Sequence, residues 1–100
     1  MKSREIMSAV AIHVLLQRAY PTKREVIQAI GDVMVLHGEV TRAYVDGMLR
    51  KEQACSTWLT NDIALPHGTN DVKTAVLRNS IVIVQLPEGI EWGKVAPLPG

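Results

Sequence analysis

The chain has 100 residues, of which 47% are hydrophobic and 21% charged, and its formal net charge is +1. This composition is that of a small globular domain, and it excludes a disordered chain, which would combine low hydrophobicity with high net charge. The near-neutral charge removes the electrostatic case for nucleic-acid binding, and no apolar run reaches the roughly 18–20 residues of a membrane helix.

The first half of the chain predicts a strand followed by two helices. Residues 10–16 form a short run rich in Val, Ile and Leu, which favours a strand, although the alanines within it leave a helix open. Thr22 and Glu25 have the spacing of a capping box, and Gly38 ends the helix that they begin. Thr41 is positioned to cap a second helix.

The second half predicts shorter elements. In order, they are an irregular stretch over 56–62, a short strand over 63–65 that Pro66 stops, a helix or loop over 70–79, a largely buried strand over 80–86, a turn over 87–89 and the beginning of a return strand over 90–92. Prolines 97 and 99 cannot donate to a sheet. This order predicts an α/β fold, in which helices flank a small mixed β-sheet, and a single domain over residues 1–100.

The three histidines have different surroundings. His13 lies in an apolar run, where a satisfied core or edge residue is expected, and His37 lies at a helix end, where it suits the helix dipole. His67 follows a short strand and a proline and precedes a glycine, so it stands on a turn at a strand's carboxyl end, where ligands gather in α/β sheets. A neutral imidazole there is a usable nucleophile or proton carrier.

Cysteine usage points to a reducing compartment. Cys55 is the sole cysteine, so it cannot form an internal disulfide, and no Cys/His spacing suggests zinc. A pairing of Cys55 with His67 is conceivable, but an ordinary thiol is the simpler interpretation. We therefore expect a cytoplasmic protein without a metal or cofactor, and with no direct membrane insertion.

The sequence also resembles a known family. Residues 56–69, STWLTNDIALPHGT, are similar to the active-site stretch of the mannitol/fructose-type enzyme IIA domain of the bacterial sugar phosphotransferase system, which reads roughly S-T-x-L-G-N-G-I-A-[IVL]-P-H-G-T. TKREVI over 22–27, GEV over 38–40 and VIVQLPEGIEW over 82–92 match further family segments in the same order, and the last is most like the mannitol branch. The similarity covers about residues 12–93.

The resemblance implies a phosphocarrier, a component of a phosphotransferase. In the family, the histidine of the PHG motif accepts a phosphoryl group from phospho-HPr and passes it to a cysteine of the IIB domain, which phosphorylates the sugar during uptake. Here that role falls on His67, with Pro66 and Gly68 shaping the turn. The sugar itself is not encoded in this domain, since specificity in this system lies largely in the membrane domain.

Several positions depart from the family pattern. Lys51 stands where the family usually has an arginine, with Arg50 one position earlier, and either would be the charged neighbour of the phosphate; lysine lacks the bidentate fork of arginine. Thr69 would be a hydrogen-bonding neighbour, with a helix cap or turn role as the alternative. Two family glycines are replaced by Thr60, which positive φ would strain, and by Asp62, which adds negative charge.

The largest departure is in length, because the C-terminal part of the family domain, with a second active-site histidine, is absent from this sequence. Its loss would uncover one sheet face and one sheet edge, so we expect self-association through that face. The alternative to a phosphocarrier is a non-catalytic remnant or regulatory binding module of the same family that no longer relays phosphate.

Overall fold

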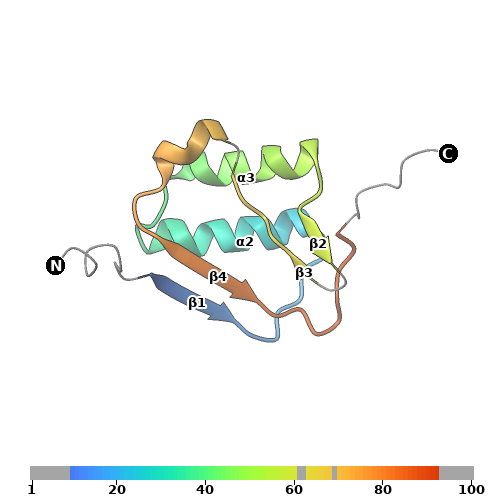
Figure 1. Cartoon of the computed structure of the whole chain (residues 1–100). Coiled ribbons are helices and arrows are strands. Elements are labelled where there is room, and N and C mark those ends of the chain that lie inside the picture. The colour runs from blue at the N-terminus through green and yellow to red at the C-terminus, as the bar shows by residue number, and fades with distance from the viewer. Residues whose placement is uncertain (1–9, 61–62, 69, 93–100) are drawn as a thin grey trace.

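A computed structural model describes residues 10–60, 63–68 and 70–92 of the chain. The elements are, in chain order, β1 (Ala11–Leu15), α2 (Lys23–Leu36), α3 (Arg42–Ala54), β2 (Trp58–Thr60), β3 (Ile63–Ala64), the 3-10 helix η1 (Asn70–Ala75) and β4 (Ser80–Val84). Helix α2 packs against β4, and α3 packs against α2 and η1, so that both helices lie on one side of the β1–β4 pair (Figure 1). The α/β class predicted from the sequence is confirmed.

The strands form two separate pairs in the described part of the chain. β1 and β4 are parallel, with Ile12 opposite Ile81 and Val14 opposite Ile83. β2 and β3 are antiparallel and form a short hairpin. The strands predicted over 10–16, 63–65 and 80–86 are therefore present, each within the predicted bounds.

The ends of α2 follow the predicted capping chemistry. The Thr22 side chain accepts a hydrogen bond from the backbone N–H of Glu25, as a capping box requires. After the helix, Gly38 has a φ of 72°, a left-handed conformation that a glycine adopts without penalty. Thr41 occupies the N-cap of α3 but makes no side-chain capping bond, so the second helix begins without the predicted cap.

The core lies between the two helices and the inner face of the sheet. Aliphatic residues from α2 and α3 supply most of it, as the absence of Phe predicts. Its members are Val26, Ile27, Ile30, Met34, Val40, Val45, Met48 and Trp92. Trp92 follows the last strand and closes this core, so the segment after β4 folds back onto the helices.

The other face of the β1–β4 pair is apolar and exposed. Its six large side chains are between 45% and 62% exposed: Val10, Ile12, Val14, Leu16, Ile81 and Ile83. The prediction that the strand over 80–86 is largely buried was therefore wrong for every second residue. A continuous apolar run is typical of a strand that is buried on both faces. Here, however, no described residue covers the outer face of β4.

Three local predictions need correction or completion. Residues 58–60, predicted to be irregular, form β2, because pairing with β3 gives this stretch ladder hydrogen bonds that its sequence does not announce. Residues 90–92 do not form a strand; they are irregular, and Ile90 and Trp92 pack against the core instead. The helix-or-loop alternative for 70–79 resolves into η1, kinked at Val72, followed by irregular chain. The proline-rich tail lies outside the described residues.

Candidate functional site

His67 stands on the loop after β3, and its imidazole is exposed. Its Nδ1 atom lies 2.9 Å from the carbonyl oxygen of Leu65, two residues earlier. Because a carbonyl oxygen can only accept, Nδ1 carries the hydrogen in this pair, and the neutral ring keeps its lone pair on Nε2. The turn thus holds a histidine in a defined tautomer with one nucleophilic nitrogen.

The turn is tied to α3 through the next residue. The backbone N–H of Gly68 donates to the Tyr44 hydroxyl at 3.1 Å. A Cβ added at Gly68 would lie 2.8 Å from both Tyr44 Cε1 and Val72 Cγ2, closer than side-chain carbons approach one another. Pro66, which is half-buried, fixes φ just before the histidine. The conformation around His67 is therefore set by a proline on one side and by close packing on the other.

The loop also exposes apolar surface beside the imidazole. Ile63 is 54% exposed and Leu65 is 61% exposed, and both lie within four residues of His67. Exposed apolar side chains around a polar group are typical of a surface that docks another molecule.

Helix α3 places the two basic candidates differently. Tyr44, which bonds Gly68, precedes Lys51 by seven residues, so at 3.6 residues per turn the two share one face of the helix, about 10 Å apart along its axis. Arg50 is rotated by about 120° from Tyr44 on the same count. Lys51 is half-buried, and Arg50 is exposed. The helix therefore places Lys51, rather than Arg50, on the face of α3 that carries Tyr44.

Three other positions were named from the sequence, Thr60, Asp62 and Thr69, and only Thr60 lies among the described residues. Thr60 ends β2, and the only non-glycine residue with positive φ in the described part of the chain is Gln17. The strain considered at Thr60 is therefore absent, because the strand conformation keeps its backbone extended. Thr69 and Asp62 lie outside the described residues.

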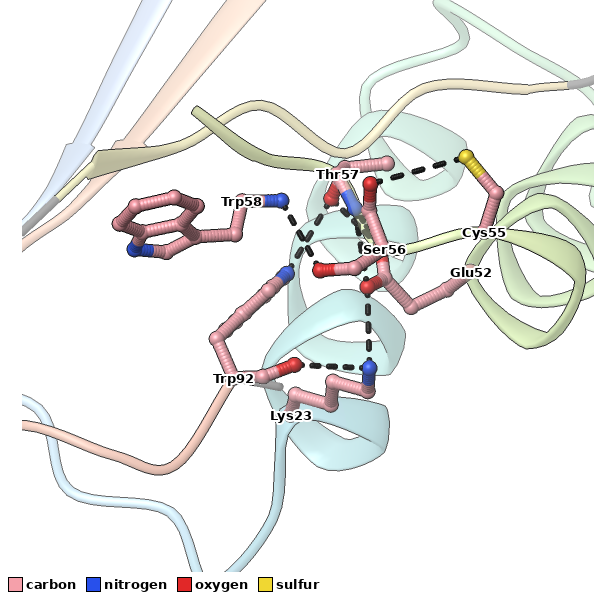
Figure 2. Close-up of polar contacts among 7 residues, drawn as sticks. All are labelled: Lys23, Glu52, Cys55, Ser56, Thr57, Trp58 and Trp92. Atoms are coloured by element: carbon pink, nitrogen blue, oxygen red, sulfur yellow. Dashed lines mark hydrogen bonds and ion pairs between the residues drawn. The ribbon is translucent and has the colours of Figure 1, made fainter. Parts of the chain in front are cut away.

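A buried polar cluster anchors the segment leading to His67. The sequence motifs do not indicate this cluster. Glu52, in the last turn of α3, accepts hydrogen bonds from the Thr57 backbone N–H and hydroxyl. Lys23 Nζ bridges Glu52 Oε2 at 3.0 Å and the Trp92 carbonyl oxygen at 2.8 Å. The Trp92 indole N–H donates to the Thr57 hydroxyl at 3.2 Å. Figure 2 shows how this cluster joins α2, α3, the segment before β2 and the end of the described chain.

The charge of Glu52 is stabilised within this cluster. Burial opposes its ionisation, but the hydrogen bonds from Thr57 and Lys23 outweigh burial and lower the pKa of Glu52 below its ordinary value. The sequence did carry a signal for this residue. Glu52 follows Val45 and Met48 at helical spacing, which places a carboxylate on the buried face of α3.

His13 and His37 belong to a separate cluster. His13 Nε2 lies 2.7 Å from Glu39 Oε2, and the two imidazole rings are 4.4 Å apart. Burial raises the pKa of the Glu39 carboxyl, but hydrogen bonds from His13 and Ser80, together with the nearby charges of the His13 and His37 imidazoles, outweigh burial and lower the pKa overall. His37 Nδ1 contacts the Val33 carbonyl oxygen at 2.9 Å. Both rings are thus engaged within the fold rather than joined to His67.

The cysteine and the grouping of metal-ligating side chains also bear on the site. The exposed Cys55 has its Sγ 3.7 Å from the Ser56 carbonyl oxygen, as a thiol without special surroundings would. Among the described residues no group of three or more metal-ligating side chains comes together, and no helix is long and apolar enough to cross a membrane.

Comparison with known proteins places this geometry in context. The sequence model of the family described as "Phosphoenolpyruvate-dependent sugar phosphotransferase system, EIIA 2" matches residues 8–98. The mannitol-specific phosphotransferase enzyme IIA component of Bacillus subtilis is 38% identical over 82 residues, which are 82% of this chain and 57% of that protein. The multiphosphoryl transfer protein of Escherichia coli O157:H7 is 45% identical over 71% of this chain and 19% of its own length.

Solved structures give the same result for the fold. The complex of enzyme IIA and phosphorylated enzyme IIB for mannitol from Escherichia coli matches with a TM-score of 0.79 and 38% identity, over 82% of this chain and 57% of that one. The crystal structure of IIA mannitol from Escherichia coli matches with a TM-score of 0.78 and 39% identity, over 82% and 58% respectively. The chain thus spans a little over half the length of these enzyme IIA relatives.

Proposed function

The chain belongs to the EIIA 2 family of the phosphoenolpyruvate-dependent sugar phosphotransferase system, and from this premise we propose that it is a phosphocarrier whose phosphoryl acceptor is His67. The observation that carries the proposal is the Nδ1–H bond to the Leu65 carbonyl oxygen on an exposed turn. This bond holds the hydrogen on Nδ1 and leaves Nε2 of the exposed His67 available as a nucleophile, within the PHG motif of the family.

Two transfers make up the proposed cycle. In the first, the Nε2 lone pair of His67 attacks phosphorus, a new N–P bond forms, and the bond to the donor's histidine nitrogen breaks with its electron pair leaving on that nitrogen. In the second, a thiolate attacks the same phosphorus and neutral imidazole leaves. Neither transfer requires His67 to gain or lose a proton, and the Leu65 carbonyl stabilises the positive charge that phosphorylation places on the ring.

The partners follow from the family and from the surface around the histidine. We assign phospho-HPr as donor and a IIB domain of mannitol type as acceptor; support for the acceptor is that one solved relative is a complex of enzyme IIA with phosphorylated enzyme IIB. A carrier must release each partner after transfer, so a small interface is expected. The exposed Ile63 and Leu65 beside the turn suit such transient docking.

Lys51 is the charged residue that we assign to the phosphoryl oxygens, because it shares the Tyr44 face of α3. A lysine acts there as a mobile point charge, and in-line positioning with charge neutralisation is most of what phosphoryl transfer needs. Thr69 remains a predicted hydrogen-bonding neighbour.

Intact-mass measurement after incubation with phosphoenolpyruvate, enzyme I and HPr tests the proposal. We expect one acid-labile phosphoryl group on the native chain and on His13→Ala and His37→Ala, and none on His67→Ala. If a chain shown to be folded by NMR gains no phosphoryl group, the regulatory binding module becomes the better account.

A further inference from the structure

Two histidines and a buried carboxylate come together where β1 meets the corner between α2 and α3. His13 lies in β1, His37 is the C-cap of α2, and Glu39 follows His37 by two residues. The two imidazole rings are 4.4 Å apart between their centroids and are tilted by 34°. His13 alternates with the exposed residues of β1, so the cluster lies on the helix side of the sheet and not on its exposed apolar face.

Each imidazole uses one nitrogen within the fold and has a lone pair on the other. His13 Nε2 lies 2.7 Å from Glu39 Oε2; because a carboxylate accepts, Nε2 carries the hydrogen and the lone pair of the neutral ring is on Nδ1. His37 Nδ1 lies 2.9 Å from the Val33 carbonyl oxygen, so its lone pair is on Nε2 for the same reason. Histidines that bind metals have this arrangement, since the nitrogen that does not bind the metal donates to a carboxylate or a backbone carbonyl.

The carboxylate of this cluster is buried without a permanent positive charge beside it. Glu39 is 1% exposed, and its Oε1 atom has no hydrogen-bond partner among the described residues. The basic groups that the described residues place near it are the His13 and His37 imidazoles, which, unlike lysine or arginine, are charged only when protonated. Buried charges in proteins are paired or lie beside metals. A cation held by the two imidazoles would therefore balance the charge of Glu39.

We propose that His13 Nδ1 and His37 Nε2 bind one zinc ion, or another late divalent transition metal that prefers imidazole, with Glu39 orienting the His13 ring. Tetrahedral Zn–N bonds place two ligating nitrogens about 3.3 Å apart, which rings this close together can reach. Glu39 acts through His13 rather than as a ligand, and water completes the coordination. This agrees with the lack of any group of three ligating side chains in the described ranges.

The consequence for the fold is a link between β1 and the end of α2. The sequence does not announce it, because the two histidines are far apart along the chain and have none of the spacings of zinc motifs. Since only the folded chain brings the two rings together, bound zinc should raise the melting temperature.

Zinc titration observed at the imidazole nitrogens tests the proposal. The probe is zinc chloride alone, added to the full chain with ¹⁵N-labelled histidine and with Cys55→Ser, because a thiolate is itself a zinc ligand. We expect the resonances of His13 Nδ1 and His37 Nε2 to shift, while His13 Nε2 and His37 Nδ1 keep their hydrogens. Magnesium, which prefers oxygen ligands, should shift neither ring.

Variants measured by calorimetry separate this pair from a single imidazole. His37→Gln changes an exposed side chain, so the fold should be retained while zinc affinity falls at least about tenfold and the rise in melting temperature is lost. His13→Gln should have the same effect. Glu39→Gln should weaken binding about tenfold or more, as expected for the partner of a ligating histidine. His67→Gln, which removes an exposed imidazole outside the cluster, is the matched control and should keep the native zinc affinity.

Three results would overturn the proposal. They are unshifted His13 and His37 nitrogens at millimolar zinc, a shift of one ring without the other, and a zinc affinity that is lost in His67→Gln but kept in His37→Gln. A His13 imidazolium at pH 7 that zinc does not change would show that a proton, rather than a metal, balances Glu39.

Discussion

The carboxylate of Glu52 accepts hydrogen bonds from both the backbone N–H and the hydroxyl of Thr57, so the last turn of α3 holds the start of the segment that leads to His67. Both residues are buried, at 7% and 8% exposure. Lys23 and Trp92 complete the cluster, which links this segment to the first turn of α2. The segment that leads to the candidate acceptor is thus anchored by the buried carboxylate of Glu52.

This cluster predicts acid sensitivity. The pKa of Glu52 is lowered from 4.5 in the fold, so its contribution to stability is present above pH 4.5 and is lost as the pH falls through the lower folded value. Glu52→Gln should reduce the free energy of unfolding at pH 7 by about 1–3 kcal/mol, because a buried charged hydrogen-bond partner is removed. Urea unfolding at pH 7 and at pH 3.5 measures both values.

The difference between the two pH values is the decisive readout. The loss of stability on acidification should be smaller in Glu52→Gln than in the native chain, though not zero, since the pKa values of Asp32 and Glu39 are also lowered. Glu88→Gln, at an exposed position, serves as the matched control and should keep the native loss. An equal loss in Glu52→Gln would mean that Glu52 does not stabilise the fold through its charge.

The packing of Gly68 predicts a local effect on phosphorylation. In Gly68→Ala the methyl group would lie 2.8 Å from Tyr44 and Val72, so the turn or these two side chains must shift, and we expect phosphoryl acceptance to slow at least tenfold with the global fold retained. Tyr44→Phe removes the acceptor for the Gly68 N–H but adds no clash, so it should cost about 1 kcal/mol of stability and slow acceptance less. Rapid quench-flow with mass detection gives the rates of phosphoryl acceptance, and NMR checks the fold. Native rates in Gly68→Ala would show that the close packing does not position His67.

Lys51 and Arg50 should differ in their effect on the rate. Lys51→Ala should slow phosphoryl acceptance by about tenfold, as expected for loss of one charge from the phosphoryl oxygens, and Lys51→Arg should restore much of it. Arg50→Ala, on another face of the same helix turn, is the matched control and should stay within about twofold of the native rate. A larger loss from Arg50→Ala than from Lys51→Ala would reverse the assignment.

The elements best predicted from the sequence are those whose signals are local. The capping box of Thr22 and Glu25, the left-handed Gly38 and the strand over 80–86 are all present, because each depends on neighbours in the chain. β2 was missed because its stability comes from pairing with β3. The exposure of Ile81 and Ile83 was missed because burial depends on what packs over a face.

For the candidate site, the position of the histidine could be predicted from the sequence, but the residues around it could not. The PHG turn was readable directly, as were the residues that shape it. The Nδ1 contact with Leu65, the Tyr44 bond to Gly68 and the buried Glu52 cluster all join residues through the folded backbone. Local spacing along the chain carries little information about such contacts.

The exposed sheet face predicts association of the chain with itself. Ile12, Val14, Ile81 and Ile83 lie opposite one another on this face and are each more than half exposed. Sedimentation at increasing concentration should show reversible oligomers, and Ile12→Lys with Ile83→Lys should shift them to monomer, since charges on that face oppose its burial. Asp46→Lys is the control for added charge. A sharp monomer boundary at all concentrations, with cooperative melting, would contradict this expectation.

The most direct test of the central claim is to locate the phosphoryl group on the chain by NMR. After phosphorylation through enzyme I and HPr, ³¹P–¹⁵N coupling in histidine-labelled protein should identify a single phosphohistidine at His67, with phosphorus on Nε2 and hydrogen on Nδ1. Phosphorus on Nδ1, or on His13 or His37, or a folded chain that accepts no phosphoryl group, would contradict the account.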